Sequence, residues 1–166
     1  MADKSSFTAE EWALVLRSVM TAGVAVSMAD PSGLWGLLRE GVASASALAE
    51  AKIDPRADAL VRAVVDDLGT AEGRGAARDG LKAQLTGSTP AQTKQKCIDT
   101  LRQASALLDA KAPDDSAAFK GWLRHISQRV AEAASEGGFL GIGGTKVSDA
   151  EKAELAEISN ALGLPA

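Results

Sequence analysis

The sequence predicts an all-α fold, a compact bundle of six or seven helices in a single domain spanning residues 1–166. Tyrosine is absent and aromatic residues make up only 4% of the chain, while alanine is the commonest residue. Alanine is the best helix former, whereas strands favour β-branched and aromatic residues. No segment alternates apolar and polar residues over the length of a strand. A chain of 166 residues buries roughly 70% of its unfolded surface, so it needs neither a disulfide nor a metal to fold.

The first predicted helix spans residues 8–28. Thr8 is a good N-cap, and Glu11 three residues later completes a capping box. Phe7 and Trp12 occupy the positions of a hydrophobic staple, while residues 1–7 as a whole are expected to form a flexible N-terminus. The apolar run in this helix is short for a membrane span and contains an arginine, so we expect a buried central helix and no integral membrane segment.

Asp-Pro pairs at 30–31 and 54–55 mark the starts of the next two predicted helices, because proline suits the first helical turn. These helices are expected over 30–48 and 54–68, and Gly69 is a stop signal for the second of them.

A fourth helix, over 71–85, is predicted less strongly. Its glycines Gly73, Gly75 and Gly80 each cost about 1 kcal/mol relative to alanine in a helix.

Three capped helices are predicted in the second half of the chain. Their apolar stripes place Cys97 and Trp122 toward the core, so we expect Cys97 to be an inert, buried thiol. His125 lies at the edge of its stripe and is expected to be partly buried. The start signals are Thr89 with Gln92, Pro113, and Ser148 with Glu151, and the helices are predicted over 89–108, 113–136 and 148–163.

Composition excludes several classes of function. The net charge of -4 and the pI near 5.1 predict no nucleic-acid partner, since such proteins usually carry a basic surface. One cysteine and one histidine exclude multi-cysteine zinc sites, CxxC redox pairs and HExxH sites. There is no GxSxG nucleophile elbow. The charged N-terminal residues do not resemble a signal peptide, so a cytoplasmic location is expected.

A glycine-rich connection over residues 137–147 separates the last two predicted helices. It has neither the spacing of a phosphate-binding loop nor the carboxylates of an EF-hand. Glycine permits positive φ angles, so a tight hairpin is expected to fold Phe139, Leu140 and Ile142 onto the bundle. Alternatively, these three side chains bind a protein partner.

Acidic residues flank this connection. Glu136 ends one helix, and Asp149, Glu151 and Glu154 lie in the first turns of the next. If the hairpin brings the helix ends together, these carboxylates converge into a site for a divalent cation such as Ca²⁺ or Mg²⁺, which prefer oxygen ligands. The alternative is that the acids stabilise the N-terminus of the helix through its dipole.

This C-terminal pattern resembles the tellurite-resistance TerB-like helical family, over about 35 residues. The resemblance implies an all-α fold, a divalent-metal site at the acids, and a stress-linked or scaffold role; it does not imply an enzyme. Glu136 stands where the family usually has aspartate, and the turn is longer here. A weaker copy of the pattern places Asp30 and Glu40 around an earlier turn. The matching positions are Ala133-Ala134, Glu136-Gly137, Val147-Ser148, Glu151 and Leu162-Gly163.

The sequence therefore predicts a non-enzymatic binding or scaffold protein that holds a divalent cation at the hairpin. A second hypothesis is a bundle that binds a small apolar ligand or a protein partner without metal. Stretches of small residues, such as residues 43–49, can leave an apolar pocket between helices. A third hypothesis is an enzyme that uses His125 with nearby acids. The oligomeric state is left open.

Overall fold

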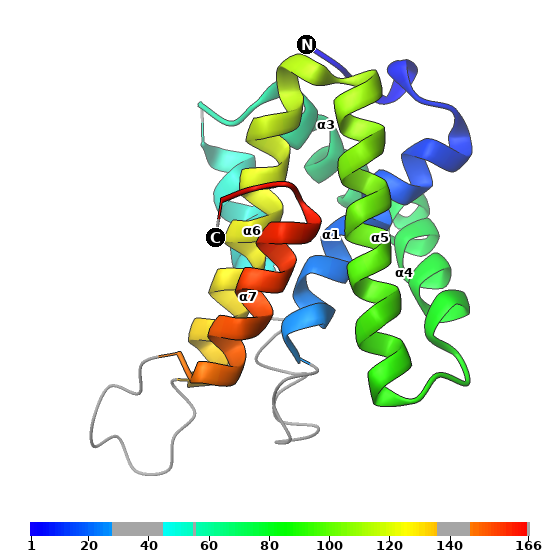
Figure 1. Cartoon of the computed structure of the whole chain (residues 1–166). Helices are drawn as coiled ribbons and strands as arrows, with labels where there is room; N and C mark the ends of the chain where they lie inside the picture. Colours follow the sequence, from blue (N-terminus) through cyan, green and yellow to red (C-terminus); the bar gives the residue numbers. More distant parts are fainter. Residues whose placement is uncertain (28–44, 55, 136–146, 166) are drawn as a thin grey trace.

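The computed structural model describes residues 1–27, 45–54, 56–135 and 147–165. Every regular element in these ranges is helical, and the helices pack into a compact bundle (Figure 1). The predicted all-α fold is confirmed.

The elements follow the chain order of Figure 1. A helical segment covers residues 45–53. The other elements are η1 (Lys4–Ser6), α1 (Ala9–Ser27), α3 (Ala59–Leu68), α4 (Ala71–Leu85), α5 (Pro90–Lys111), α6 (Pro113–Ser135) and α7 (Asp149–Ala161).

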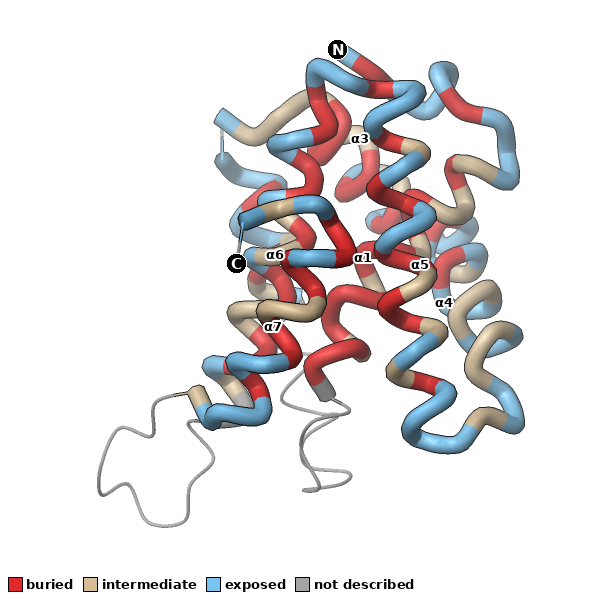
Figure 2. Tube along the Cα trace, viewed as in Figure 1, coloured by how far each residue is buried: buried red, intermediate tan, exposed pale blue. Residues whose placement is uncertain are grey.

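Helix α1 forms the centre of the bundle. It packs against α4, α5 and α6, and α7 lies across α5 and α6. Figure 2 shows that α1 is buried along most of its length. The hydroxyl of Ser127 on α6 donates to the carbonyl of Ala22 at 2.7 Å, which satisfies a buried hydroxyl between the two helices. The predicted buried central helix is confirmed, and no helix among the described residues is long and apolar enough to cross a membrane.

The predicted capping boxes fix the starts of α1, α5 and α7. At the start of α1, the Thr8 amide donates to Glu11 Oε2 at 2.7 Å, and the Glu11 amide donates to Thr8 Oγ1 at 3.3 Å. The Phe7 and Trp12 rings lie 5.7 Å apart, as the hydrophobic staple requires. The same reciprocal hydrogen bonds begin α5 and α7.

Helix α3 starts later than the Asp-Pro signal at 54–55 predicts. The Asp54 carboxylate accepts a hydrogen bond from the Arg56 amide at 2.8 Å, and the Asp54 carbonyl accepts one from the Ala57 amide at 3.1 Å. These bonds close a turn, so the backbone does not enter a helix there. Asp58 is the N-cap, and its Oδ1 accepts from the Leu60 amide at 3.0 Å.

The N-terminal segment also differs from the flexible tail that the sequence predicts. Residues Lys4–Ser6 form η1, capped by Asp3. Ala2 and Phe7 are buried, and the Ala2 amide donates to Asp115 Oδ2 at 2.6 Å. The segment is thus held by both apolar and polar contacts.

Helix α4 forms over the predicted residues despite its glycines. Gly73 is required by close packing, because a Cβ atom there would lie 2.2 Å from the Asp67 carbonyl oxygen. A Cβ atom at Gly75 would meet nothing within 4 Å. The two glycines therefore have different physical roles.

Candidate functional site

The acids of the predicted metal site have separate structural roles in the described part of the chain. Glu151 completes the cap of α7, because its Oε2 accepts from the Ser148 amide at 2.7 Å. The Asp149 side chain is fully exposed and pairs with Lys152 at 3.1 Å. Glu154 is buried, and its Oε2 lies 2.9 Å from Lys94 Nζ.

Lys94 joins α5 to α7. Its ammonium also lies 2.7 Å from Glu157 Oε2, and the hydrogen bonds to Glu157 and Glu154 raise the pKa of Lys94. The other oxygen of Glu154, Oε1, is buried without a hydrogen-bond partner. Cys97 of α5 is fully buried, and burial raises the pKa of its thiol to about 11, with the Glu154 carboxylate adding to the effect. The predicted burial of Cys97 is confirmed.

No group of three or more histidine, cysteine or acidic side chains within the described ranges could hold a metal ion. The fourth predicted ligand, Glu136, lies outside those ranges, as do the predicted partner-binding residues Phe139, Leu140 and Ile142. Asp30 and Glu40 of the weaker copy lie outside them too.

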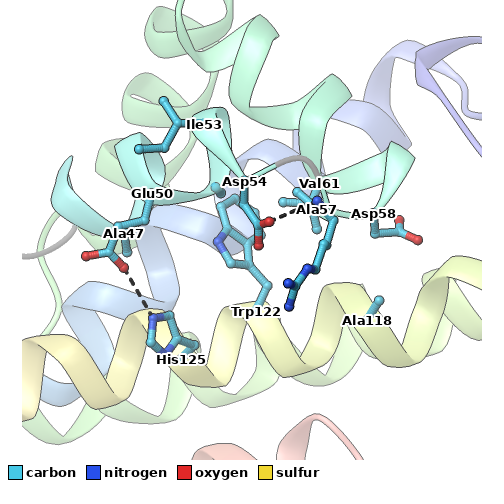
Figure 3. A pocket seen from close by; sticks show the side chains of 12 residues that line it. Ala47, Glu50, Ile53, Asp54, Ala57, Asp58, Val61, Ala118, Trp122 and His125 are labelled. Carbon is cyan, nitrogen blue, oxygen red and sulfur yellow. Dashed lines mark hydrogen bonds and ion pairs between the residues drawn. The ribbon is translucent and has the colours of Figure 1, made fainter.

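A pocket of about 460 Å³ opens to solvent on another side of the bundle (Figure 3). It lies between helix 45–53, the turn that precedes α3, α3 itself, and α6. Over the described residues, its lining combines small apolar side chains, one indole, three carboxylates, one guanidinium and one imidazole. The lining residues are Ala47, Glu50, Ala51, Ile53, Asp54, Arg56, Ala57, Asp58, Val61, Ala118, Trp122 and His125.

Small side chains create this space. Ala47 and Ala51 face the bundle from helix 45–53 and are buried, as is Val61 of α3. Side chains of this size leave a gap beside the much larger indole of Trp122, which rises from α6 toward helix 45–53 (Figure 3). Ile53 also lines the pocket and is 81% exposed.

Trp122 is half-buried, which differs from the core position that its helical stripe predicts. Its ring packs edge-on against the fully buried Phe119, with the ring centroids 5.4 Å apart. The indole nitrogen is buried and has no hydrogen-bond partner, so the part of the ring that solvent reaches is carbon. Trp122 therefore presents an apolar, π-electron surface to the pocket.

Glu50 bridges the pocket to α6. Its carboxylate lies 3.1 Å from an Arg129 nitrogen and 3.7 Å from His125 Nε2. The His125 side chain is 51% exposed, so the predicted partial burial is wrong. The histidine lies on the outer edge of α6, where its imidazole faces Glu50 across the opening (Figure 3).

The turn before α3 supplies the remaining charges. Asp54 and Asp58 engage backbone amides through the turn and cap described above. Burial raises the pKa of the Asp58 carboxyl, and the neighbouring Asp115 carboxylate adds to the rise. In Figure 3 the carboxylate of Asp54 points toward the indole of Trp122, whereas that of Asp58 points away from it.

This lining suits binding better than covalent chemistry. Among the lining residues that the structure describes there is no serine, threonine, cysteine or lysine to act as a nucleophile. Comparison of the chain with protein-family models, curated proteins and solved structures gives no match.

Sequence reasoning found only part of this pocket. The alanines of residues 43–49 signalled that space between helices could exist, and Ala47 does line the pocket. No local sequence pattern predicts a site at Glu50, Asp54 or Trp122, because their proximity depends on how helix 45–53 packs against α6. Residues 45–54 and 118–125 are far apart in sequence, so no short motif joins them.

Proposed function

We propose that this protein is a non-enzymatic binding protein whose pocket beside Trp122 takes a small, largely apolar molecule. The observation that carries the proposal is the pocket of about 460 Å³, with its small apolar floor and the carbon surface of one large aromatic ring. Ligand sites typically have volumes of about 300–1,000 Å³ and combine apolar walls with a few polar groups.

The arrangement of polar groups supports the same reading. The charged side chains lie around an apolar interior, and Glu50 is already paired with Arg129. A ligand can therefore bury its apolar body without removing that ion pair from solvent. Burial of apolar surface supplies roughly 25 cal/mol per Å², which is the main favourable term for such a ligand.

A neutral aromatic probe tests this function. Titration with 2-phenylethanol, followed through the indole N–H signals by NMR, is expected to shift the Trp122 signal and to leave the Trp12 signal in place. The indole N–H of Trp12 already has an acceptor, since it donates to Asp67 Oδ2 at 2.6 Å. A Trp122→Leu variant assigns the signal and is expected to weaken binding.

A pair of alanines on α6 provides a matched control. Both Ala117 and Ala118 are exposed, but only Ala118 lines the pocket. Ala118→Leu is expected to fill the pocket and weaken binding, whereas Ala117→Leu adds the same side chain outside it and should leave binding unchanged. Equal effects of the two variants, or no shift of the Trp122 signal, would overturn the proposal.

A divalent-cation site of TerB-like character at the start of α7 is a second candidate. The Oε1 atom of Glu154 favours it, because a buried oxygen that accepts no hydrogen bond is costly even though Oε2 is paired with Lys94. At 100 times its dissociation constant, a cation would stabilise the fold by about 2.7 kcal/mol. Thermal unfolding of the full chain with Ca²⁺, Mg²⁺ or EDTA should show this gain in stability. Glu154→Gln should abolish the gain, and Asp149→Asn tests whether the exposed carboxylate contributes to it. Identical unfolding in all three solutions would remove this candidate.

A further inference from the structure

The charges around the Trp122 pocket are unequal. Among the residues that the structure describes, three carboxylates line it, against one guanidinium and one imidazole. Glu50 is paired with the Arg129 guanidinium, and the His125 imidazole lies 3.7 Å from its carboxylate. Asp54 has no ion pair with any residue that the structure describes, although its carboxylate points toward the indole of Trp122. A cleft with an excess of one charge concentrates ligands of the opposite charge.

Trp122 favours the same ligand charge. The accessible part of its indole is carbon, so a ligand meets the π surface and not the N–H donor. A cation over the face of an indole is attracted by the negative potential of the ring, and tryptophan is the strongest of the aromatic side chains in this respect. An anion placed there gains neither this attraction nor a free N–H.

We propose that the ligand is a small organic cation, with an ammonium group attached to an apolar body. This inference rests on the proposed function. The apolar body lies on Ala51, Val61 and the indole of Trp122, and the ammonium lies between that indole and the carboxylate of Asp54. Arg56 supplies the guanidinium among the described lining residues. It reduces the negative charge of the pocket without reversing it.

Three probes with the same phenyl group separate the charge preference from apolar binding. They are 2-phenylethylammonium, 2-phenylethanol and 3-phenylpropanoate, and their dissociation constants are measured by the same NMR titration at low salt. The ammonium is expected to bind roughly three- to tenfold more tightly than the alcohol, through the combined cation–π and ion-pair interactions. The propanoate is expected to bind more weakly than the alcohol.

Two aspartate variants carry the same change in net charge. Asp54→Asn is expected to weaken ammonium binding roughly threefold and to leave alcohol binding unchanged. Asp79 lies on α4, outside the pocket lining, with its side chain 69% exposed. Asp79→Asn is expected to leave the binding of all three probes unchanged, which separates a local carboxylate effect from the net charge of the protein.

The outcomes distinguish this inference from the function on which it rests. Equal binding of ammonium and alcohol, with both lost in Ala118→Leu, would overturn the cation preference and keep the apolar pocket. Tighter binding of the propanoate would also overturn it and would point to Arg56 as the charged contact. Failure of all three probes to shift the Trp122 signal would overturn both proposals.

Discussion

Two glycines in one helix should respond to alanine substitution with opposite signs. In α4, a Cβ atom at Gly73 would lie 2.2 Å from the Asp67 carbonyl oxygen, whereas one at Gly75 would meet nothing within 4 Å. Alanine at either position gains about 0.5–1 kcal/mol from helix propensity and from a less flexible unfolded chain. At Gly73, but not at Gly75, the steric contact of the added Cβ atom opposes that gain.

That cost follows from what holds the Asp67 carbonyl in place. Its oxygen accepts from the Thr70 amide at 2.9 Å and from the Thr70 hydroxyl at 2.7 Å, and Thr70 in turn caps α4 by accepting from the Gly73 amide at 3.0 Å. Because the contact would be with the backbone, α4 must move away from the end of α3. Overpacking costs about 1–3 kcal/mol and loss of the cap about 1 kcal/mol, so Gly73→Ala should be destabilising by about 1–3 kcal/mol net.

Urea unfolding followed by far-ultraviolet circular dichroism measures both variants. Gly75→Ala is expected to raise the free energy of unfolding by about 0.5–1 kcal/mol, and Gly73→Ala to lower it, with unchanged m-values. In a chain of this size, 1 kcal/mol shifts Tm by about 2–4 °C. A Gly73→Ala variant as stable as the parent would refute the assigned close approach of α3 and α4.

Three further predictions concern titratable groups. Asp67→Ala should lower the free energy of unfolding by about 1–3 kcal/mol at pH 7, because the buried Trp12 indole loses its acceptor. That hydrogen bond lowers the pKa of Asp67, so its contribution is present above pH 3.8 and is lost as the pH falls through the folded-state pKa; urea unfolding of both proteins at pH 7 and pH 2 should show the difference shrinking. Asp58→Asn keeps a good N-cap but removes a carboxyl whose pKa is raised by burial and by Asp115. In the parent protein the ionised carboxylate lowers the free energy of unfolding, and this loss grows as the pH rises through the folded-state pKa. The variant should therefore be more stable by about 0.2–1 kcal/mol at pH 7 and equal to the parent at pH 3; a loss of stability at pH 7 would contradict this. The Cys97 thiol should react with a disulfide reagent at pH 8 roughly a thousandfold more slowly in the native protein than in urea, since it is fully buried and its pKa is raised to about 11, and rapid labelling of the native protein would argue against its burial.

The position of helix 45–53 explains why the candidate site was hard to foresee. Glu50 and Asp54 belong to one short stretch, and Trp122 and His125 belong to another. Each has an ordinary local explanation: Glu50 is a solvated charge and Asp54 belongs to a turn. Trp122 fits a core aromatic residue, and His125 lies at the edge of an apolar stripe. They form a pocket only because alanines let helix 45–53 lie beside the Trp122 indole without filling the space between them. The exposure of His125 and the half-burial of Trp122 follow from the same packing.

The sequence by itself determined the all-α class, the caps of α1, α5 and α7, the central position of α1 and the burial of Cys97. Each depends on residues within about one helical turn or on the spacing of one apolar stripe, and such interactions are readable along the chain. Only the tertiary structure decided that Asp58 and not the earlier Asp-Pro pair starts α3, that Gly73 is needed while Gly75 is dispensable, and that Trp122 borders a pocket. The pocket depends on distances between segments far apart in sequence, whereas the start of α3 and the contact at Gly73 depend on the path of the backbone between neighbouring helices. Helical periodicity specifies which face of a helix is buried without specifying what that face meets.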